Sequence, residues 1–136
     1  MTKEITLEAK VENIAAVTEL VDGILEENSC PIKSQIQIDV AIDELLSNIA
    51  FYAYDSDGGD VTVRIEIAED PKSVNITFID SGQPYNPLEK EDPDVTLPAE
   101  ERQIGGLGIF LVKKTMDDVI YTYEDGRNNL TIKKLI

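Results

Sequence analysis

Residues 38–54 read Ile38-Asp-Val-Ala-Ile-Asp-Glu-Leu-Leu-Ser-Asn-Ile-Ala-Phe-Tyr-Ala-Tyr54. The apolar residues of this stretch recur every three or four positions, which is the spacing of one helix face; they are Ile38, Ile42, Leu45, Ile49 and Ala53. Glu44 and Asn48 lie four positions apart, so on a helix they project from the same side, one turn apart. A solvated Glu-x-x-x-Asn pair is common, and the spacing gains meaning only if other segments complete a binding site.

The segments on either side predict strands and two more helices. Alternating apolar residues predict strands at residues 3–9, 61–67, 74–80, 119–123 and 130–132. Residues 13–28 have helical spacing and end before Cys30-Pro31. We expect the central helix to begin around Ser34, which is a candidate N-cap. An apolar run after Gly105 predicts a third helix, and Asp125-Gly126 predicts a tight turn between the last two strands.

The predicted order of elements is therefore β-α-α-β-β-loop-α-β-β, in one domain over residues 1–136. Short turns between neighbouring strands favour antiparallel pairing. We expect an α+β fold, a two-layer α/β sandwich in which a mixed, mostly antiparallel sheet carries the helices on one face. Residues 81–105 contain four prolines and form a long loop, of which residues 86–105 are a candidate lid.

Composition excludes several classes of function. The chain has 27 acidic and 12 basic residues, a net charge of −15, which disfavours nucleic acid and anionic membranes and favours either a basic protein partner or simply solubility. It has no histidine and one cysteine, Cys30, which excludes a Ser-His-Asp triad, a Cys-His pair and autophosphorylation on histidine. The sequence has no apolar stretch of membrane-span length and no signal-peptide core, so we expect a cytoplasmic protein.

Two further motifs accompany the central helix. Asp80-Ser-Gly82-Gln-Pro84 follows a predicted strand, where a buried carboxylate can accept a hydrogen bond. Gly105-Gly106-Leu107-Gly108 precedes the third helix, where bare backbone amides suit phosphate. It is neither a Walker A loop nor a dinucleotide fingerprint, because no Lys-Ser/Thr follows and Leu111 stands where a third glycine belongs. Each motif alone also has an ordinary explanation: a strand cap, a turn or a relaxed loop.

Taken together and in this order, the three motifs resemble the N box and the two glycine boxes of Bergerat-fold (GHKL-type) ATPases. The match is to the anti-sigma factor serine-protein kinase family of bacteria in particular, and it runs from Ile38 to the C-terminus. The segments that carry it are Glu44-Leu-Leu-Ser-Asn48-Ile-Ala-Phe-Tyr-Ala-Tyr54, Asp80-Ser-Gly-Gln-Pro-Tyr-Asn-Pro87 and Gly105-Gly-Leu-Gly-Ile-Phe-Leu-Val112. Tyr52 stands where family members often carry histidine. The resemblance implies a Bergerat ATP-binding fold with ATP and Mg²⁺ as its ligands.

The resemblance also implies roles for single residues. Glu44 is the expected catalytic base, and Asn48 is the expected Mg²⁺ ligand. Asp80 would accept a hydrogen bond from the adenine amino group, and Gly82 would let the base approach the backbone. Arg102 is a candidate partner of the terminal phosphate, with an ordinary surface arginine as the alternative. The other expected nucleotide contacts are the remaining motif positions, which are Pro84, Gly105, Gly106, Leu107 and Gly108.

These roles imply a serine-protein kinase that phosphorylates a small anti-sigma-antagonist protein of the STAS type in a partner switch. A sigma factor is a further candidate partner, and a homodimer is a candidate assembly. The alternative is a partner-switching module that holds nucleotide without phosphotransfer; Glu44 favours the enzyme, because a nucleotide holder needs no base. A plain acidic interaction domain is a third possibility. A detached histidine-kinase catalytic domain ranks low, because the chain is short and has no histidine.

Overall fold

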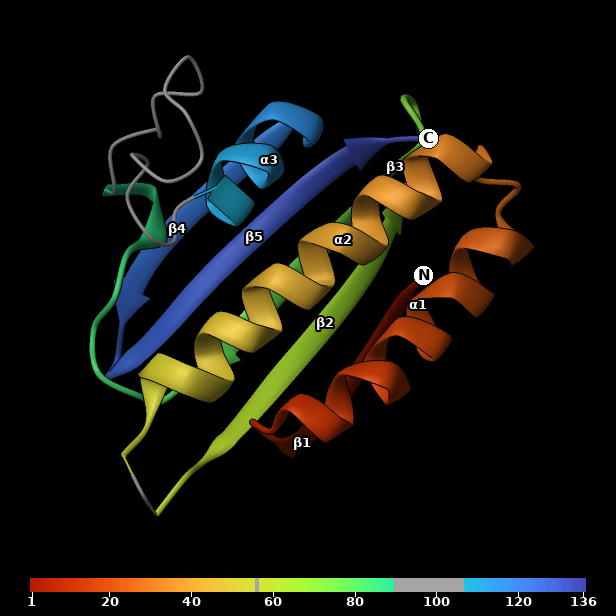
Figure 1. The fold of residues 1–136 in the computed structure, drawn as a ribbon. Helices are drawn as coiled ribbons and strands as arrows, with labels where there is room; N and C mark the ends of the chain where they lie inside the picture. Colours follow the sequence, from red (N-terminus) through yellow and green to blue (C-terminus); the bar gives the residue numbers. More distant parts are fainter. Residues whose placement is uncertain (56, 90–106) are drawn as a thin grey trace.

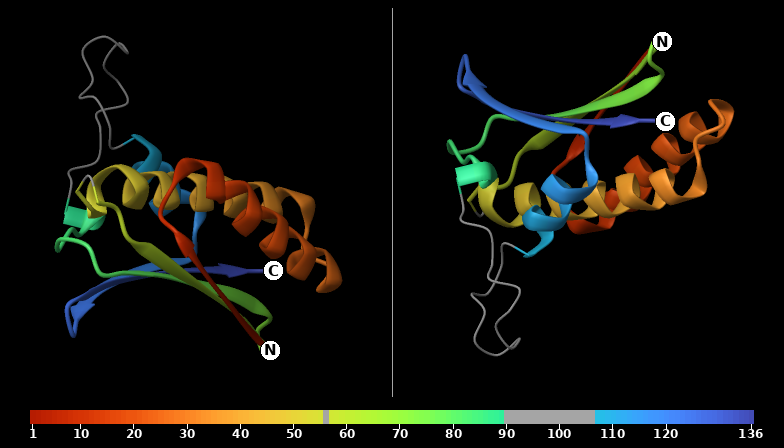
Figure 2. Two further views of the ribbon diagram at one scale, coloured as in Figure 1. Left: turned by 90° about the horizontal axis from the view of Figure 1, so that it is seen from below. Right: turned by 90° about the horizontal axis from the view of Figure 1, so that it is seen from above.

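The computed structural model describes residues 1–55, 57–89 and 107–136. Their strands form a five-stranded sheet in the order β1-β2-β3-β5-β4, and each neighbouring pair is antiparallel. The strands are β1 (Thr2–Glu8), β2 (Asp60–Ala68), β3 (Ser73–Asp80), β4 (Asp118–Glu124) and β5 (Arg127–Leu135). Helices α1 (Ile14–Glu27), α2 (Ile32–Asn48) and α3 (Leu107–Thr115) cover one face of the sheet (Figures 1 and 2). The predicted element order and two-layer sandwich are confirmed, with a sheet that is antiparallel throughout these residues.

The core lies between the sheet and the helices. The strand register aligns apolar side chains across the central strands, so that Ile76 lies opposite Ile65 on one side and Ile132 on the other. The predicted apolar face of the central helix is confirmed, because Ile38 and Ile42 are fully buried on α2. Each such side chain contributes about 1.5–3 kcal/mol through removal from water. This burial holds α2 along the middle of the sheet, between α1 and α3 (Figure 1).

The two ends of α2 differ from the expectation. The helix begins at Ile32, two residues before the predicted start around Ser34, and the predicted N-cap is wrong, because Pro31 is the N-cap residue. The Pro31 carbonyl accepts the first helical hydrogen bond, from the Gln35 N–H at 3.0 Å, and proline itself has no N–H to leave unsatisfied. At the other end, a turn of π-helix, η2 (Ile49–Ala53), follows directly on α2. Such turns are frequent at functional sites.

Short segments connect these elements. A 3₁₀ turn, η1 (Val11–Asn13), leads into α1, and a second, η3 (Pro87–Glu89), begins the predicted lid. The rest of that lid lies outside the described residues. Asp125 and Gly126 both have positive φ, 54° and 75°, which confirms the predicted tight turn between β4 and β5. Within the described ranges, no helix combines the length and the apolar composition needed to cross a membrane.

Candidate functional site

Asp80 is a buried carboxylate at the end of β3, with 5% of its surface exposed. Its Oδ1 accepts hydrogen bonds from the Gly82 N–H at 2.9 Å and from Nδ2 of Asn128 at 3.0 Å. Burial raises the pKa of Asp80, and these two hydrogen bonds act in the opposite direction by favouring the ionised form. Both bonds go to the same oxygen, so the plane of the carboxylate is fixed.

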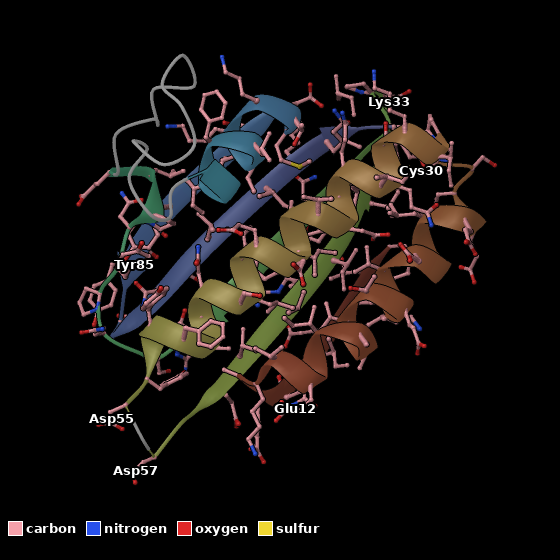
Figure 3. All side chains as sticks on the ribbon, viewed as in Figure 1. Glu12, Cys30, Lys33, Asp55, Asp57 and Tyr85 are labelled. Carbon is pink, nitrogen blue, oxygen red and sulfur yellow. The ribbon has the colours of Figure 1, made fainter. Side chains whose placement is uncertain are left out.

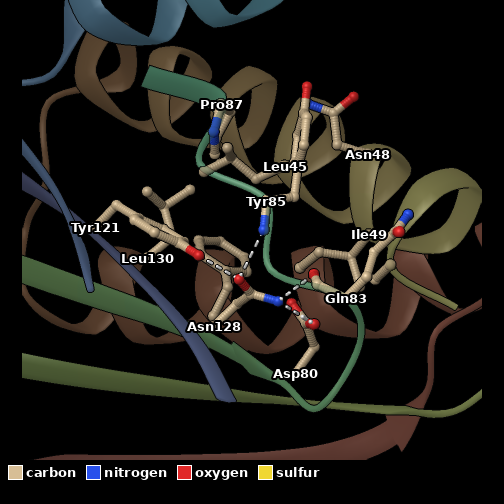
Figure 4. A pocket seen from close by; sticks show the side chains of 12 residues that line it. Leu45, Asn48, Ile49, Asp80, Gln83, Tyr85, Pro87, Tyr121, Asn128 and Leu130 are labelled. Carbon is tan, nitrogen blue, oxygen red and sulfur yellow. Dashed lines mark hydrogen bonds between the residues drawn. The ribbon is translucent and has the colours of Figure 1, made fainter. Parts of the chain in front are cut away.

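Asn128 on β5 holds this carboxylate, and the sequence analysis did not find it. Its Nδ2 also donates to the Gln83 carbonyl at 2.9 Å. Its Oδ1 accepts from the Tyr85 N–H at 3.1 Å and from the Tyr121 hydroxyl (Figure 4). Asn128 is 5% exposed, so a polar side chain here depends on these partners. A signal was present, because Asn128 continues the inward alternation of Leu130 and Ile132, but the predicted strand began only at Leu130.

The turn after Asp80 packs against the end of the central helix. The Gln83 N–H donates to the Ala53 carbonyl at 2.9 Å, and Nε2 of Gln83 donates to the Tyr52 carbonyl at 2.8 Å. A Cβ atom at Gly82 would lie 2.1 Å from the Ala53 carbonyl oxygen, so only glycine fits this approach. Gly82 therefore has a packing role in addition to the base contact that the resemblance implies. The π-turn η2 supplies both carbonyl acceptors.

These elements surround a pocket that is open to solvent. Its empty volume is about 420 Å³ when the solvent at its mouth is included. Its wall is mostly apolar, with Leu45, Ile49, Phe78 and Leu130 among its residues, and Asp80 and Asn128 add polar groups. Figure 4 shows Asn48 on the α2 side of this pocket. An apolar slot with a few fixed polar groups is the usual form of a small-molecule site.

Glu44 lies one turn before Asn48, where α2 meets α3. Both side chains are half-buried. A Cβ atom at Gly108 would lie 2.1 Å from Cδ of Glu44, so α3 approaches the Glu44 carboxyl group through the bare backbone of Gly108. The structure thus places Gly108, a predicted phosphate contact, directly beside Glu44, the predicted base. The carboxylate and the carboxamide lie on one side of α2, as their spacing predicted.

The other predicted residues divide into two groups. Pro84 is exposed, and its neighbours Gln83 and Tyr85 line the pocket in its place. Leu107 is the first residue of α3. Arg102, Gly105 and Gly106 lie outside the described residues, so their expected contacts stay predictions. Tyr52 is 56% exposed, and its ring centroid lies 6.4 Å from that of Tyr85 at the pocket.

A two-layer sandwich with a pocket at the junction of sheet and helices is the architecture of Bergerat-type ATP-binding domains. A family model described as "Histidine kinase-like ATPase domain" matches residues 7–134 of the chain. The chain therefore belongs to the histidine kinase-like ATPase family, as the motifs of the central helix and the glycine boxes predicted.

Within this family, the chain is similar to bacterial serine-protein kinases. It is 28% identical over 134 residues to the serine-protein kinase RsbW of Bacillus mycoides (strain KBAB4), a match that covers 96% of this chain and 82% of that protein. The serine-protein kinase RsbW of Bacillus cereus (strain ATCC 10987 / NRS 248) has the same identity and coverage. The predicted resemblance to the anti-sigma factor serine-protein kinase family is thereby confirmed.

Solved structures share the fold. The crystal structure of the RsbU and RsbW domains of Rv1364c from Mycobacterium tuberculosis matches 99% of this chain with a TM-score of 0.71 and 19% identity, and the match covers 32% of that longer chain. The histidine kinase domain of the blue-light activated histidine kinase EL346 from Erythrobacter litoralis matches 92% of this chain and 60% of that one, with a TM-score of 0.59 and 16% identity. At these identities the matches establish the fold.

Proposed function

We propose that this protein is an ATP-dependent serine-protein kinase that phosphorylates a small anti-sigma-antagonist protein of the STAS type. The main support is the position of Glu44, whose carboxyl group is packed against Gly108 one helical turn from the pocket residue Asn48. A protein that only holds nucleotide needs the pocket but has no use for a carboxylate beside it. The similarity to named serine-protein kinases supports the same activity.

The pocket residues suit an adenine nucleotide. The apolar wall can enclose the base, and Oδ2 of Asp80 is the oxygen that would accept from the adenine amino group, because Oδ1 is already used by Gly82 and Asn128. The amide oxygen of Asn48 is a suitable ligand for Mg²⁺, a hard cation. Bound Mg²⁺ would supply positive charge against the phosphates. The Gly106 and Gly108 amides would receive the phosphates, with Arg102 at the terminal one.

The proposed chemistry is phosphoryl transfer to a serine hydroxyl. Glu44 accepts the hydroxyl proton as the serine oxygen forms its bond to the γ-phosphorus of ATP. The bond from that phosphorus to the bridging oxygen breaks, and ADP leaves with its electron pair. A positioned base of this kind contributes on the order of 10²–10⁴ in rate. The half-buried position of Glu44 keeps its carboxylate in one place for this task.

Charge gives a physical reason for partner release. Phosphorylation adds about −1.5 to −2 to the substrate, which then faces a chain of net charge −15. Repulsion between like charges weakens the complex, so the antagonist leaves after transfer. A sigma factor with a basic surface would compete for the same protein, and a homodimer is the proposed assembly. We propose that the protein acts with these partners in the cytoplasm.

The decisive experiment compares wild type with Glu44→Gln in the presence of ATP, Mg²⁺ and a small anti-sigma-antagonist protein of the STAS type. Glu44→Gln should bind nucleotide normally and transfer phosphate on the order of 10²–10⁴ more slowly. Asn48→Ala and Asp80→Asn should each lose about ten- to a hundredfold in nucleotide affinity by calorimetry, the worth of one charge-assisted contact. Equal activity of Glu44→Gln and wild type would refute the assigned base. A stable complex without phosphoserine would establish the nucleotide-holding module instead.

A further inference from the structure

The outer side of α2 carries a row of exposed aliphatic residues. Ile32, Ile36 and Val40 are 69%, 57% and 50% exposed, and their spacing of four places them on one helix face. This face is opposite the one that buries Ile38 and Ile42 in the core. Single exposed aliphatic residues are ordinary on protein surfaces, but three in a continuous row mark an interaction surface. We call these three residues the α2 stripe.

Acidic residues border the α2 stripe on its α1 side. Asp39 lies beside the stripe on α2, just before Val40, and Asp43 lies just beyond it; Asp22 on α1 interacts with Asp39. Glu19 and Glu26 lie three and four residues from Asp22, so they share the α1 face that is turned toward α2. An apolar row with a negative border complements a surface that is apolar on one side and positively charged on the other.

The border contains two carboxyl oxygens that have no donor. Oδ1 of Asp22 and Oδ1 of Asp39 are both buried, and when both acids are ionised no hydrogen-bond donor of residues 1–55, 57–89 or 107–136 reaches either atom; when Asp39 is protonated, the pair shares its proton. An unsatisfied buried carboxylate is costly, and a cation that approaches it recovers that cost. Both residues are only half-buried, so a Lys or Arg side chain of another molecule can approach the exposed part of this acidic pair and offset its charge.

The ionisation of this pair agrees with its geometry. Burial, a hydrogen bond that protonated Asp39 donates to Asp22, and the charge of Asp22 together raise the pKa of Asp39 to about 7. Asp43, Glu19 and Glu26 add negative charge around this pair, and the Cys30 thiol interacts electrostatically with Asp39 and with the Lys134 ammonium. Burial and then the charge of Asp39 raise the pKa of Cys30, while Lys134 lowers it. Lys134 donates to the Thr115 carbonyl at 2.6 Å, so its ammonium is already bound within the chain.

We propose that the α2 stripe and its acidic border bind a basic amphipathic helix of a protein partner. Apolar residues of that helix pack on Ile32, Ile36 and Val40, and a Lys or Arg side chain reaches Asp22 and Asp39. The stripe spans about 12 Å, or two helical turns, at 1.5 Å per residue. Figure 3 shows Lys33 at the end of α2 opposite to the pocket residue Tyr85, so this surface is separate from the nucleotide site and the proposal does not rest on phosphotransfer.

The first test uses the whole chain and a synthetic probe. The probe is a fluorescent peptide of about five helical turns, with leucine along one side and lysine along the other, and binding is followed by anisotropy at physiological ionic strength. A scrambled peptide of the same composition has the same charge without the apolar side. We expect the scrambled peptide to bind at least about tenfold more weakly. Equal binding of the two peptides, or no binding of the amphipathic one, would overturn the proposal.

The second test uses matched variants. Ile36→Gln removes an apolar contact from the stripe and should weaken binding about tenfold, whereas Ile120→Gln makes the same change at a residue of β4 that is 52% exposed and should have no effect. An Ile36→Gln variant that binds like wild type would refute the stripe. Asn48→Ala should bind the peptide like wild type, which keeps this result independent of the nucleotide site.

The third test uses pH. Because the cation binds the ionised pair, wild-type affinity should rise from about pH 6 to about pH 8 as Asp39 loses its proton. Asp39→Asn should bind more weakly at the higher pH and should lose this rise. Glu124→Gln, which removes the same charge in the distant β4–β5 turn, should keep it. A rise that persists in Asp39→Asn would show that the pair does not receive the cation.

Discussion

Gly108 has no side chain, and this leaves room for the Glu44 carboxylate between α2 and α3. A substitution at Gly108 can therefore test the contact between these two residues without disturbing the core. A methyl group at Gly108 would lie 2.1 Å from Cδ of Glu44, which is the far end of a flexible side chain. Gly108→Ala should therefore displace the carboxylate rather than the helix, and the phosphotransfer rate should fall by roughly ten- to a hundredfold while ATP still binds. Rate and nucleotide affinity, measured side by side, test this.

A matched control exists in α1. Gly23 is also a helical glycine, and a Cβ atom there would meet no atom within 4 Å. Gly23→Ala should raise the free energy of unfolding by about 0.5–1 kcal/mol, because alanine favours helix, and should leave the rate unchanged. Equal rates for the Gly23 and Gly108 variants would argue against a positioned Glu44.

Asn128 gives a second prediction for a single residue. Asn128→Ala removes the donor to the Gln83 carbonyl and to Asp80 Oδ1 inside the protein. We expect a loss of about 1–3 kcal/mol in the free energy of unfolding, together with weaker ATP binding, because Asp80 is no longer held. Denaturant unfolding and calorimetry measure the two effects. Asn129→Ala, whose exposed side chain donates a long hydrogen bond of 3.3 Å to the Arg127 carbonyl, should change stability by less than about 0.5 kcal/mol.

Among the elements, the turn after β3 and the π-turn η2 act as one unit. Gly82→Ala places a methyl group 2.1 Å from the Ala53 carbonyl oxygen, and backbone yields less readily than a side chain. The two segments should separate, at a cost of about 1–3 kcal/mol in unfolding free energy, and nucleotide affinity should fall with it. Thermal melting and ATP titration check both effects. Ser81→Ala at the exposed neighbouring position should melt like wild type.

The sequence predicted the elements better than the contacts between them. Period-two alternation and turn residues such as Asp125-Gly126 gave the strands, because these signals depend on near neighbours. The start of α2 was missed because proline and serine both suit a first helical turn, and only the Gln35 hydrogen bond distinguishes them. Asn128 and the Asp22–Asp39 pair were missed because each depends on partners far away in the chain. Glu44, Asn48 and Asp80 could be predicted because they lie in recognisable motifs, and their roles stay predictions.

For the whole molecule, the Asp22–Asp39 pair couples stability to pH. The ordinary pKa of Asp39 is 3.8 and its folded value is about 7, so the folded state holds the proton more tightly than the unfolded chain. The stability that this proton contributes is complete below about pH 4 and is lost as the pH rises through about 7. We expect Asp39→Asn to be more stable than wild type at about pH 8, and to show a smaller fall in melting temperature between about pH 5 and pH 8.

Glu124→Gln is the control for this measurement, because it removes one charge from the exposed β4–β5 turn. Its melting temperature should follow the wild-type dependence on pH. If Asp39→Asn and wild type lose stability in parallel over this range, the carboxyl pair is not the group that titrates.

The strand order also determines when the pocket comes into existence. β3 and β5 are neighbours in the sheet, yet Asp80 and the Asn128 that holds it are 48 residues apart in the chain. On the ribosome, α1, α2 and the β1–β2–β3 sheet emerge first, while the strand that completes the pocket wall is still being synthesised. The residues of the central helix are therefore synthesised before the β5 residues that complete the pocket. The proposed nucleotide would stabilise only chains in which β5 has paired, so we expect it to favour completely folded molecules over partly folded ones.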